Sequence, residues 1–173
     1  MLASGGFPNN ETLKRRYYRH VQQGVRHCSL APEGNTGDGL EMASRVGAAI
    51  RTDVAQPAAF MSVSELRRKN GSRGLASHSF DRAKPGVIVV DVAGRRFMNE
   101  GAPYHDFGIR QIEQCGATKG EAYLICDSRA IRRYGLGAVR PFPFPLQKWV
   151  RNGYLTTSAS VPELALKLGV DPD

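Results

Sequence analysis

A glycine-rich stretch at residues 33–48 constrains the fold of this chain more than any other segment. We expect a loop that runs into a helix, because the apolar residues in the second half recur at helical spacing. The first N–H groups of a helix are unpaired and carry partial positive charge, so a phosphate or a polar ring edge could bind there. The glycines match neither a dinucleotide fingerprint nor a P-loop, so tight turns at a helix start are the alternative. The predicted inward residues of this helix are Leu40, Ala43, Val46 and Gly47.

The beginning of the chain predicts a strand end, a glycine turn and a helix. Residues 1–7 have the composition of the end of a buried strand that continues into a turn. Asn10 is placed to cap a helix over residues 11–23, and Gly24 is placed to end it. Leu13 and Tyr17 lie on its apolar stripe.

The middle of the chain contains a basic, polar segment followed by strands. Residues 67–84 are rich in Arg, Lys, Ser and Gly and show no periodicity, so we expect a mobile surface loop with weak order. The apolar run 87–91, the turn 92–95 and the segment 96–99 together predict a β-hairpin. Residues 122–126 predict another strand.

The last third predicts two helices separated by irregular structure. Asp127 or Ser128 can cap a short helix that ends at Tyr134. The three prolines within 141–145 prevent regular structure. Residues 160–169 begin with the spacing of a capping box and end on glycine, which predicts a helix.

The length of 173 residues supports one hydrophobic core, or one core with an appendage. The net charge of +8 raises the question of an anionic partner, and a basic nucleic-acid-binding module is the alternative from another class. No helix-turn-helix, zinc-finger or aromatic RNA-binding motif is present in the sequence, so nucleic-acid binding is disfavoured.

Cysteine spacing and hydropathy give expectations about metal and location. Cys28, Cys115 and Cys126 are odd in number and far apart, so they suggest neither a disulfide framework nor a metal site. No apolar run approaches the roughly 18–20 residues that span a bilayer. We therefore expect no transmembrane segment and a cytoplasmic location.

Three segments stand out along the chain: Leu2-Ala3-Ser4-Gly5-Gly6-Phe7, Thr36-Gly37-Asp38-Gly39-Leu40-Glu41-Met42-Ala43 and Gly94-Arg95-Arg96-Phe97-Met98-Asn99-Glu100. In this order and at these separations, they resemble the flavoprotein family that contains fumarate reductases, succinate dehydrogenases and 3-ketosteroid dehydrogenases. Residues 134–137 and 153–155 look like the ketosteroid dehydrogenase side of the family.

The resemblance implies an α+β fold, with a small mixed or antiparallel sheet and helices packed around it. Such a region is the catalytic, or capping, domain inserted into an FAD-binding domain. Residues 1–48 would be a remnant of the FAD-binding domain, and residues 49–173 the catalytic domain. In dinucleotide-binding domains, a G-x-G-x-x-G turn places a helix N-terminus at the pyrophosphate of the cofactor. This turn is absent from the sequence. We therefore expect the chain to be a fragment, with the rest of the FAD-binding domain as its missing partner, and to bind FAD weakly or not at all alone.

The resemblance also implies cofactor contacts at both glycine-rich turns. The first turn would pack against the cofactor, and the backbone of the second would approach the flavin and ribityl region. At the start of a helix, Asp38 would be favourable even with no ligand present. The implied FAD-contacting residues are Ala3, Ser4, Gly5, Gly6, Thr36, Gly37 and Asp38.

The residue that follows the third segment favours one substrate class. Family members that act on succinate or fumarate usually have an arginine four residues after the glutamate matching Glu100, where this chain has Tyr104. In ketosteroid dehydrogenases the matching segment supplies a catalytic tyrosine. Gln56–Pro57 stands where the succinate-type relatives usually have a His before a Pro. An apolar ketone is therefore the expected substrate, and a fumarate-reductase-type enzyme is the alternative.

The implied reaction removes two hydrogens from neighbouring carbons beside a ketone. A base at Tyr104 would take the proton next to the carbonyl, and a hydride would leave for the flavin. Phe60 and Met61 could line an apolar slot for the substrate, although core packing explains them equally well. His105 could relay the proton, but on an extended strand it would point away from Tyr104, which favours an ordinary partly buried histidine.

Overall fold

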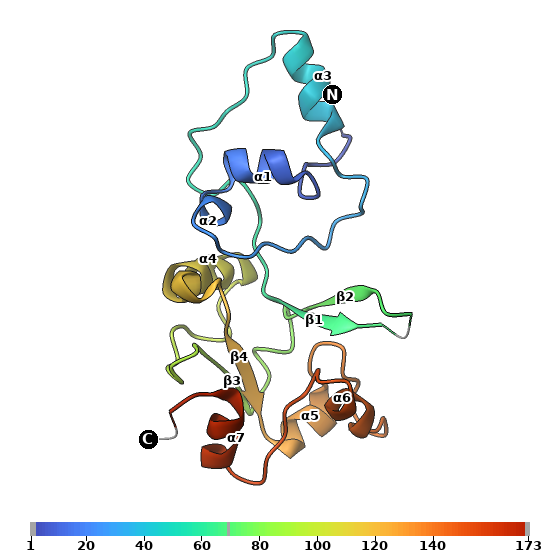
Figure 1. Ribbon diagram of the computed structural model, residues 1–173, viewed down its shortest axis with the longest axis vertical. Helices are drawn as coiled ribbons and strands as arrows, with labels where there is room; N and C mark the ends of the chain where they lie inside the picture. The colour runs from blue at the N-terminus through green and yellow to red at the C-terminus, as the bar shows by residue number, and fades with distance from the viewer. Residues whose placement is uncertain (1–2, 69, 172–173) are drawn as a thin grey trace. The chain divides into compact units, whose positions relative to one another are not determined.

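The computed structural model describes residues 3–68 and 70–171, and the chain divides into two compact units. The first unit is Met1–Ala59 and the second is Phe60–Asp173 (Figure 1). Residues 49–59 thus belong to the first compact unit, whereas the sequence boundary between functional domains was drawn before them. That functional boundary stays a prediction.

The first unit contains three short helices, α1 (Glu11–Tyr17), α2 (Arg19–Gln22) and α3 (Asp38–Arg45). The Leu13 N–H donates to the side-chain oxygen of Asn10 at 3.0 Å, which confirms the predicted cap. The single helix expected over 11–23 is wrong, because Tyr18 has extended backbone angles.

Packing of Tyr18 accounts for the break between α1 and α2. Its buried ring lies 5.3 Å from the ring of Phe7 and 4.9 Å from that of His27. Burial of an aromatic ring contributes more than the helical hydrogen bonds lost in one turn. Tertiary contact therefore overrides the local helical pattern here.

The helix expected after the glycine-rich loop is present as α3, but its inward side is smaller than predicted. Leu40 and Ala43 are partly buried, whereas Val46 follows the helix and is 83% exposed. The helix ends at Arg45, so Val46 and Gly47 leave the helical stripe.

The second unit contains a hairpin that the sequence did not reveal. Strands β1 (Val63–Arg67) and β2 (Arg73–Ser77) pair in antiparallel register, so the mobile loop expected over 67–84 is wrong for this part. The register places Glu65 opposite Leu75. Gly71 takes a positive φ of 80° in the connecting turn, a conformation that glycine adopts without strain.

The second sheet pairs β3 (Val87–Val90) with β4 (Tyr123–Cys126), also antiparallel. The expected hairpin between residues 87–91 and 96–99 is therefore wrong, because it is reduced to a single bridge between Val90 and Arg96. The buried carboxylate of Asp91 accepts the N–H groups of Ala93 and Arg95, both at 2.9 Å, and tightens the turn. The distant strand β4 pairs with β3 instead.

Helices surround these two small sheets, so the predicted α+β class is confirmed (Figure 1). Asp127 caps α5 (Ser128–Tyr134) and Ser160 caps α7 (Val161–Leu168), as the sequence predicted. No helix within residues 3–68 and 70–171 is long and apolar enough to cross a membrane. The helical elements of the second unit are α4 (Tyr104–Cys115), the 3-10 turn η1 (Gly116–Thr118), α5 (Ser128–Tyr134), α6 (Gln147–Arg151) and α7 (Val161–Leu168). The main buried cluster consists of Val87, Ala130, Ile131, Leu136 and Val139.

A histidine pair in the first unit makes its stability depend on pH. His20 Nε2 and His27 Nδ1 are 3.0 Å apart, and burial, with the charges of His20 and Lys14, lowers the pKa of His27 to about 4. An unfolded chain has a histidine pKa of about 6.5 and so binds the extra proton between the two values. The stabilisation is complete above about pH 6.5 and is lost as the pH falls toward about 4.

We expect the free energy of unfolding of the first unit to fall by about 1–2 kcal/mol across that window, after allowance for solvent screening of a half-buried side chain. Chemical denaturation between pH 4 and 7.5, compared with His27→Gln, measures this contribution. The variant should show a flatter pH dependence. Equal slopes for the two proteins would contradict the assignment to His27.

Candidate active site

Tyr104 is the first residue of α4, directly after Pro103. The extended strand assumed from the sequence at this position is wrong, because the helix begins here. The Tyr104 side chain is 47% exposed, and within the described part of the chain its hydroxyl has no hydrogen-bond partner. The phenol is therefore available to an incoming molecule.

The segment that leads into Tyr104 is held by a buried carboxylate. Glu100 accepts the Val89 N–H at 2.9 Å and is paired with the Arg96 guanidinium at 2.5 Å. Burial raises the pKa of Glu100, but the hydrogen bonds from Arg96 and Val89 outweigh this effect and lower it overall. An ionised Glu100 thus ties the segment before α4 to strand β3.

Phe60 and Met61 lie against the same helix. The Phe60 N–H donates to Nδ1 of His105 at 3.1 Å, and the two rings stack with centroids 5.6 Å apart. A Cβ on Gly108 would lie only 2.7 Å from the Cβ of Phe60, so the backbone of α4 packs closely on this segment. Phe60 is buried and Met61 is partly buried. The structure thus brings the predicted slot residues to the helix that carries Tyr104.

His105 has a definite structural role that the sequence did not indicate. Because its Nδ1 accepts the Phe60 N–H, a neutral His105 carries its proton on Nε2. The ring is half-buried between α4 and residue 60. This contact joins the start of α4 to the beginning of the second unit.

The two glycine-rich turns lie against each other in the first unit. A Cβ on Gly39 would overlap the Ser4 hydroxyl, and one on Gly5 would lie 2.8 Å from Oδ1 of Asn35. Gly37 takes a φ of 101° at the N-cap of α3, where a Cβ would lie 3.1 Å from that of Phe7. The positive φ of Gly5 and Gly37 favours glycine where the turns approach each other, whereas the overlap at Gly39 is with a hydroxyl that can rotate.

The outer face of these turns offers polar groups at a helix start. Ala3, Ser4, Gly5 and Gly6 are exposed, as are Thr36 and Asp38, whereas Gly37 is buried. The Thr36 hydroxyl donates to Asp38 Oδ1 at 2.7 Å. Gly37, not Asp38, is the N-cap residue of α3, so Asp38 does not serve as the side-chain cap. Both turns thus leave polar groups open to solvent beside the start of α3.

The second unit contains a closed network of hydrogen bonds, here named the polar ring, that the sequence did not reveal. His78 Nδ1 is 2.8 Å from Asp81 Oδ2, and His78 Nε2 is 2.9 Å from Ser64 Oγ. Ser64 Oγ is in turn 2.6 Å from the hydroxyl of Tyr154. The sequence separation from Ser64 to Tyr154 is 90 residues, so no short motif could have revealed this polar ring.

A tight turn completes the polar ring. The Gly137 N–H donates to Asp81 Oδ2 at 2.6 Å, and the Ala138 N–H donates to the Tyr154 hydroxyl at 3.1 Å. Burial raises the pKa of Asp81, but the His78 hydrogen bond and charge, with the Gly137 N–H, lower it overall. The polar ring therefore fastens strand β1, the segment after β2 and this turn together.

Ser64, His78 and Asp81 are hydrogen-bonded in the same succession as the serine, histidine and aspartate of a hydrolase catalytic triad. The other contacts of Ser64 argue against a role as nucleophile. Besides His78, Ser64 Oγ contacts the Tyr154 hydroxyl, and a Cβ on Gly137 would lie 3.4 Å from it. The Ser64 hydroxyl is thus already engaged by two side chains of the polar ring. The polar ring is a structural clasp.

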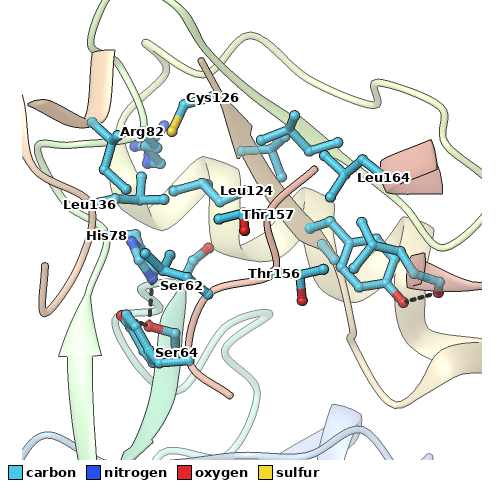
Figure 2. A pocket seen from close by; sticks show the side chains of 18 of the residues that line it. Ser62, Ser64, His78, Arg82, Leu124, Cys126, Leu136, Thr156, Thr157 and Leu164 are labelled. Carbon is cyan, nitrogen blue, oxygen red and sulfur yellow. Dashed lines mark hydrogen bonds between the residues drawn. The ribbon is translucent and has the colours of Figure 1, made fainter. Parts of the chain in front are cut away.

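A cavity of about 440 Å³ lies beside this clasp, within the second unit (Figure 2). Its walls include Leu124, Leu136 and Leu164. Neither Tyr104 nor the predicted slot residues lie among the side chains that line it. The cavity is thus separate from the exposed phenol at the start of α4.

The chain belongs to the FAD binding domain family, whose family model matches residues 1–171. FAD is the cofactor of this family, as the sequence resemblance implied, and the chain is a member of a family of FAD-dependent oxidoreductases.

Among curated relatives, the chain is 34% identical over 172 residues to a 4-oxocyclohex-2-ene-1-carboxylate 5-dehydrogenase from Sinomonas cyclohexanicum, covering 99% of this chain and 29% of the relative. It is 32% identical over 181 residues to a 3-oxosteroid 1-dehydrogenase from Mycolicibacterium smegmatis, covering 100% of this chain and 30% of that protein. The chain thus spans about three tenths of the length of these relatives.

Solved structures agree with this assignment. The 3-ketosteroid Δ1-dehydrogenase of Sterolibacterium denitrificans, crystallised with 1,4-androstadiene-3,17-dione, matches with a TM-score of 0.73 and 26% identity over 99% of this chain and 30% of its own. A flavocytochrome c3 fumarate reductase in its open conformation shares the fold, with a TM-score of 0.56 and 24% identity over 98% of this chain and 26% of its own.

Proposed function

We propose that this chain is part of an FAD-dependent dehydrogenase that oxidises a 3-ketosteroid or a similar cyclic ketone. The observation that carries the proposal is Tyr104, an exposed phenol at the start of α4 whose hydroxyl no described residue occupies. A dicarboxylate substrate would need cationic partners at this position, whereas a ketone needs a proton acceptor beside an apolar surface. The names of the relatives support the same class of substrate.

In the proposed reaction, the exposed Tyr104 hydroxyl first gives its proton to solvent, and the resulting phenolate takes the proton from the carbon next to the carbonyl group and becomes the phenol again. FAD, when bound, supplies the acceptor for the hydride that leaves the neighbouring carbon. Met61, which is partly exposed, would provide apolar contact to the ketone near the start of α4. The buried Phe60 would support this surface from beneath by stacking on His105.

The two apposed glycine turns are the proposed contact surface for FAD. The small residues of the first turn would let the cofactor approach the backbone, and the second turn would offer N–H groups at the start of α3. Further cofactor contacts would come from an FAD-binding domain that acts together with this chain. The residues that would hold the cofactor are Ala3, Ser4, Gly5, Gly6, Thr36, Gly37 and Asp38.

The experiment compares three substrates in the FAD-loaded protein that contains this chain, with a dye as electron acceptor. We expect reduction of the dye by a 3-ketosteroid or by 4-oxocyclohexanecarboxylate, and no reduction by succinate. Dye reduction by succinate alone would favour the fumarate-reductase-type alternative. No turnover of either cyclic ketone would contradict the proposal.

A further inference from the structure

The segment between β2 and β3 carries a buried arginine that sequence reasoning assigned only to a basic loop. Arg82 is 3% exposed, and its guanidinium donates to the backbone carbonyl groups of Glu100 and Ala102. The same guanidinium lies over the ring of Phe107, 4.4 Å from its centroid. Among the described residues, no carboxylate forms an ion pair with Arg82.

This arrangement is unusual because most buried cations form a direct ion pair, whereas the carboxylates of Asp81 and Glu100 act on the Arg82 guanidinium without pairing with it. A guanidinium is planar and rigid, so it holds two carbonyl groups at a fixed spacing, and an aromatic face compensates part of its desolvation. Arg82 is therefore suited to fixing the position of a backbone segment.

The segment that Arg82 fixes is the one that presents Tyr104. The carbonyl groups of Glu100 and Ala102 lie just before this residue, and Phe107 lies one helical turn after it. The guanidinium thus contacts α4 and the chain before it, on both sides of the phenol in the sequence. The Glu100 side chain adds an independent attachment to strand β3.

The opposite side of Arg82 is also anchored. Its own N–H donates to Asp81 Oδ1 at 2.9 Å, while Asp81 Oδ2 accepts from His78 and Gly137 in the polar ring. The backbone from which the guanidinium extends is therefore held by the clasp. Such a support limits the freedom of the arginine itself.

We propose that Arg82 is a positioning residue that sets the place of Tyr104 through the carbonyl groups of Glu100 and Ala102. Its catalytic consequence rests on the proposed function of Tyr104. Its structural part, the fixing of the segment before α4, does not depend on that function and is measured separately.

The structural test uses amide hydrogen exchange on this chain, with Arg82→Met, Arg82→Lys and the control Arg110→Met. Arg110 is an exposed arginine on α4 itself, paired with Glu113. Arg82→Met should speed exchange of the Phe107 N–H, which bonds the Pro103 carbonyl at 3.0 Å, about tenfold or more. Arg82→Lys should give a smaller increase, because an ammonium lacks the planar fork. Arg110→Met should change nothing at Phe107.

Exchange at the Ile131 N–H, in α5, serves as the internal reference. Unchanged exchange at Phe107 in Arg82→Met, relative to Ile131, would overturn the proposal. Should Arg82→Met not fold, Arg82→Lys decides by the same comparison.

The catalytic test uses the FAD-loaded protein and a cyclic ketone that it oxidises. Arg82→Met should lower kcat about tenfold with little change in KM, because the phenol is misplaced while the ketone still binds. In the Tyr104→Phe background the same change should have almost no further effect, since Arg82 acts through Tyr104. Fully additive losses would show a general structural role and overturn the proposal. An absence of ketone oxidation in the unaltered protein contradicts the proposed function instead, and the exchange result still decides whether Arg82 fixes the segment.

Discussion

Replacing Tyr104 by phenylalanine is expected to lower turnover of a cyclic ketone by roughly 10²–10⁴-fold in the FAD-loaded protein, the usual contribution of a general base. The change removes only the hydroxyl, which within the described part of the chain makes no hydrogen bond, so stability should stay the same. Ketone binding should weaken far less than turnover, because the lost interaction belongs to proton transfer. Steady-state kinetics and equilibrium titration with the ketone measure the two effects.

Tyr134→Phe is the matched control for this substitution. Tyr134 is a partly buried tyrosine at the end of α5, where Lys84 lies 5.8 Å from its ring centroid. We expect turnover of this variant to match that of the unaltered protein. If Tyr104→Phe behaves like the control, Tyr104 has no part in the reaction.

Gly137→Ala is expected to destabilise the second unit by about 3 kcal/mol, equal to roughly 10 °C in Tm. A Cβ at Gly137 would overlap the Tyr154 hydroxyl and lie 2.8 Å from Cε1 of His78. Both side chains would have to move, and the polar ring would leave buried groups such as His78 with fewer partners. Gly137 also has a φ of 55°, which adds a backbone penalty for alanine.

Gly153→Ala separates the two causes. Gly153 has a φ of 76°, but a Cβ there would meet open space. This variant should lose only about 1 kcal/mol, the backbone penalty alone. Thermal and urea unfolding compare the two variants. Equal losses of stability in the two variants would mean that contacts of the new Cβ with the polar ring add nothing to the destabilisation at Gly137.

A second substitution sharpens this comparison. Tyr154→Phe removes the hydroxyl that the new Cβ would overlap, at the cost of the hydrogen bonds to Ser64 and Ala138. The double variant with Gly137→Ala should therefore be more stable than the sum of the two single losses predicts. Simple additivity would show that the overlap with Tyr154 is not the cause of the destabilisation.

Features that depend on near neighbours in the chain could be predicted from the sequence. The helix caps at Asn10, Asp127 and Ser160 all bond an N–H three residues further on, so their geometry is local. The left-handed glycine at the end of α7, Gly169, follows the same logic. Family membership was also predictable, because the glycine-rich turns occur in a fixed order.

The strand pairing and the start of α4 were predicted badly or not at all. Strand β3 pairs with β4, far along the chain, although a nearer segment had the pattern of a hairpin partner. The hairpin β1–β2 lies partly in a segment whose composition indicated disorder. The strand expected at Tyr104 is the start of a helix. For β3, pairing with a distant strand outweighed a weak local preference. The hairpin β1–β2 and the start of α4 are local structures that composition and residue pattern did not indicate.

The sequence by itself determined the family, the α+β class, the helix caps and the identity of the residue at the candidate reaction centre. Only the tertiary structure decided that the two glycine turns touch, that Tyr104 has an unoccupied hydroxyl at a helix start, and that Arg82 reaches the chain beside it. The physical reason is the separation along the chain of the residues that interact. Caps and turns are set by interactions across a few residues, whereas a buried guanidinium or a hydrogen-bonded ring exists only once distant segments have packed and excluded water.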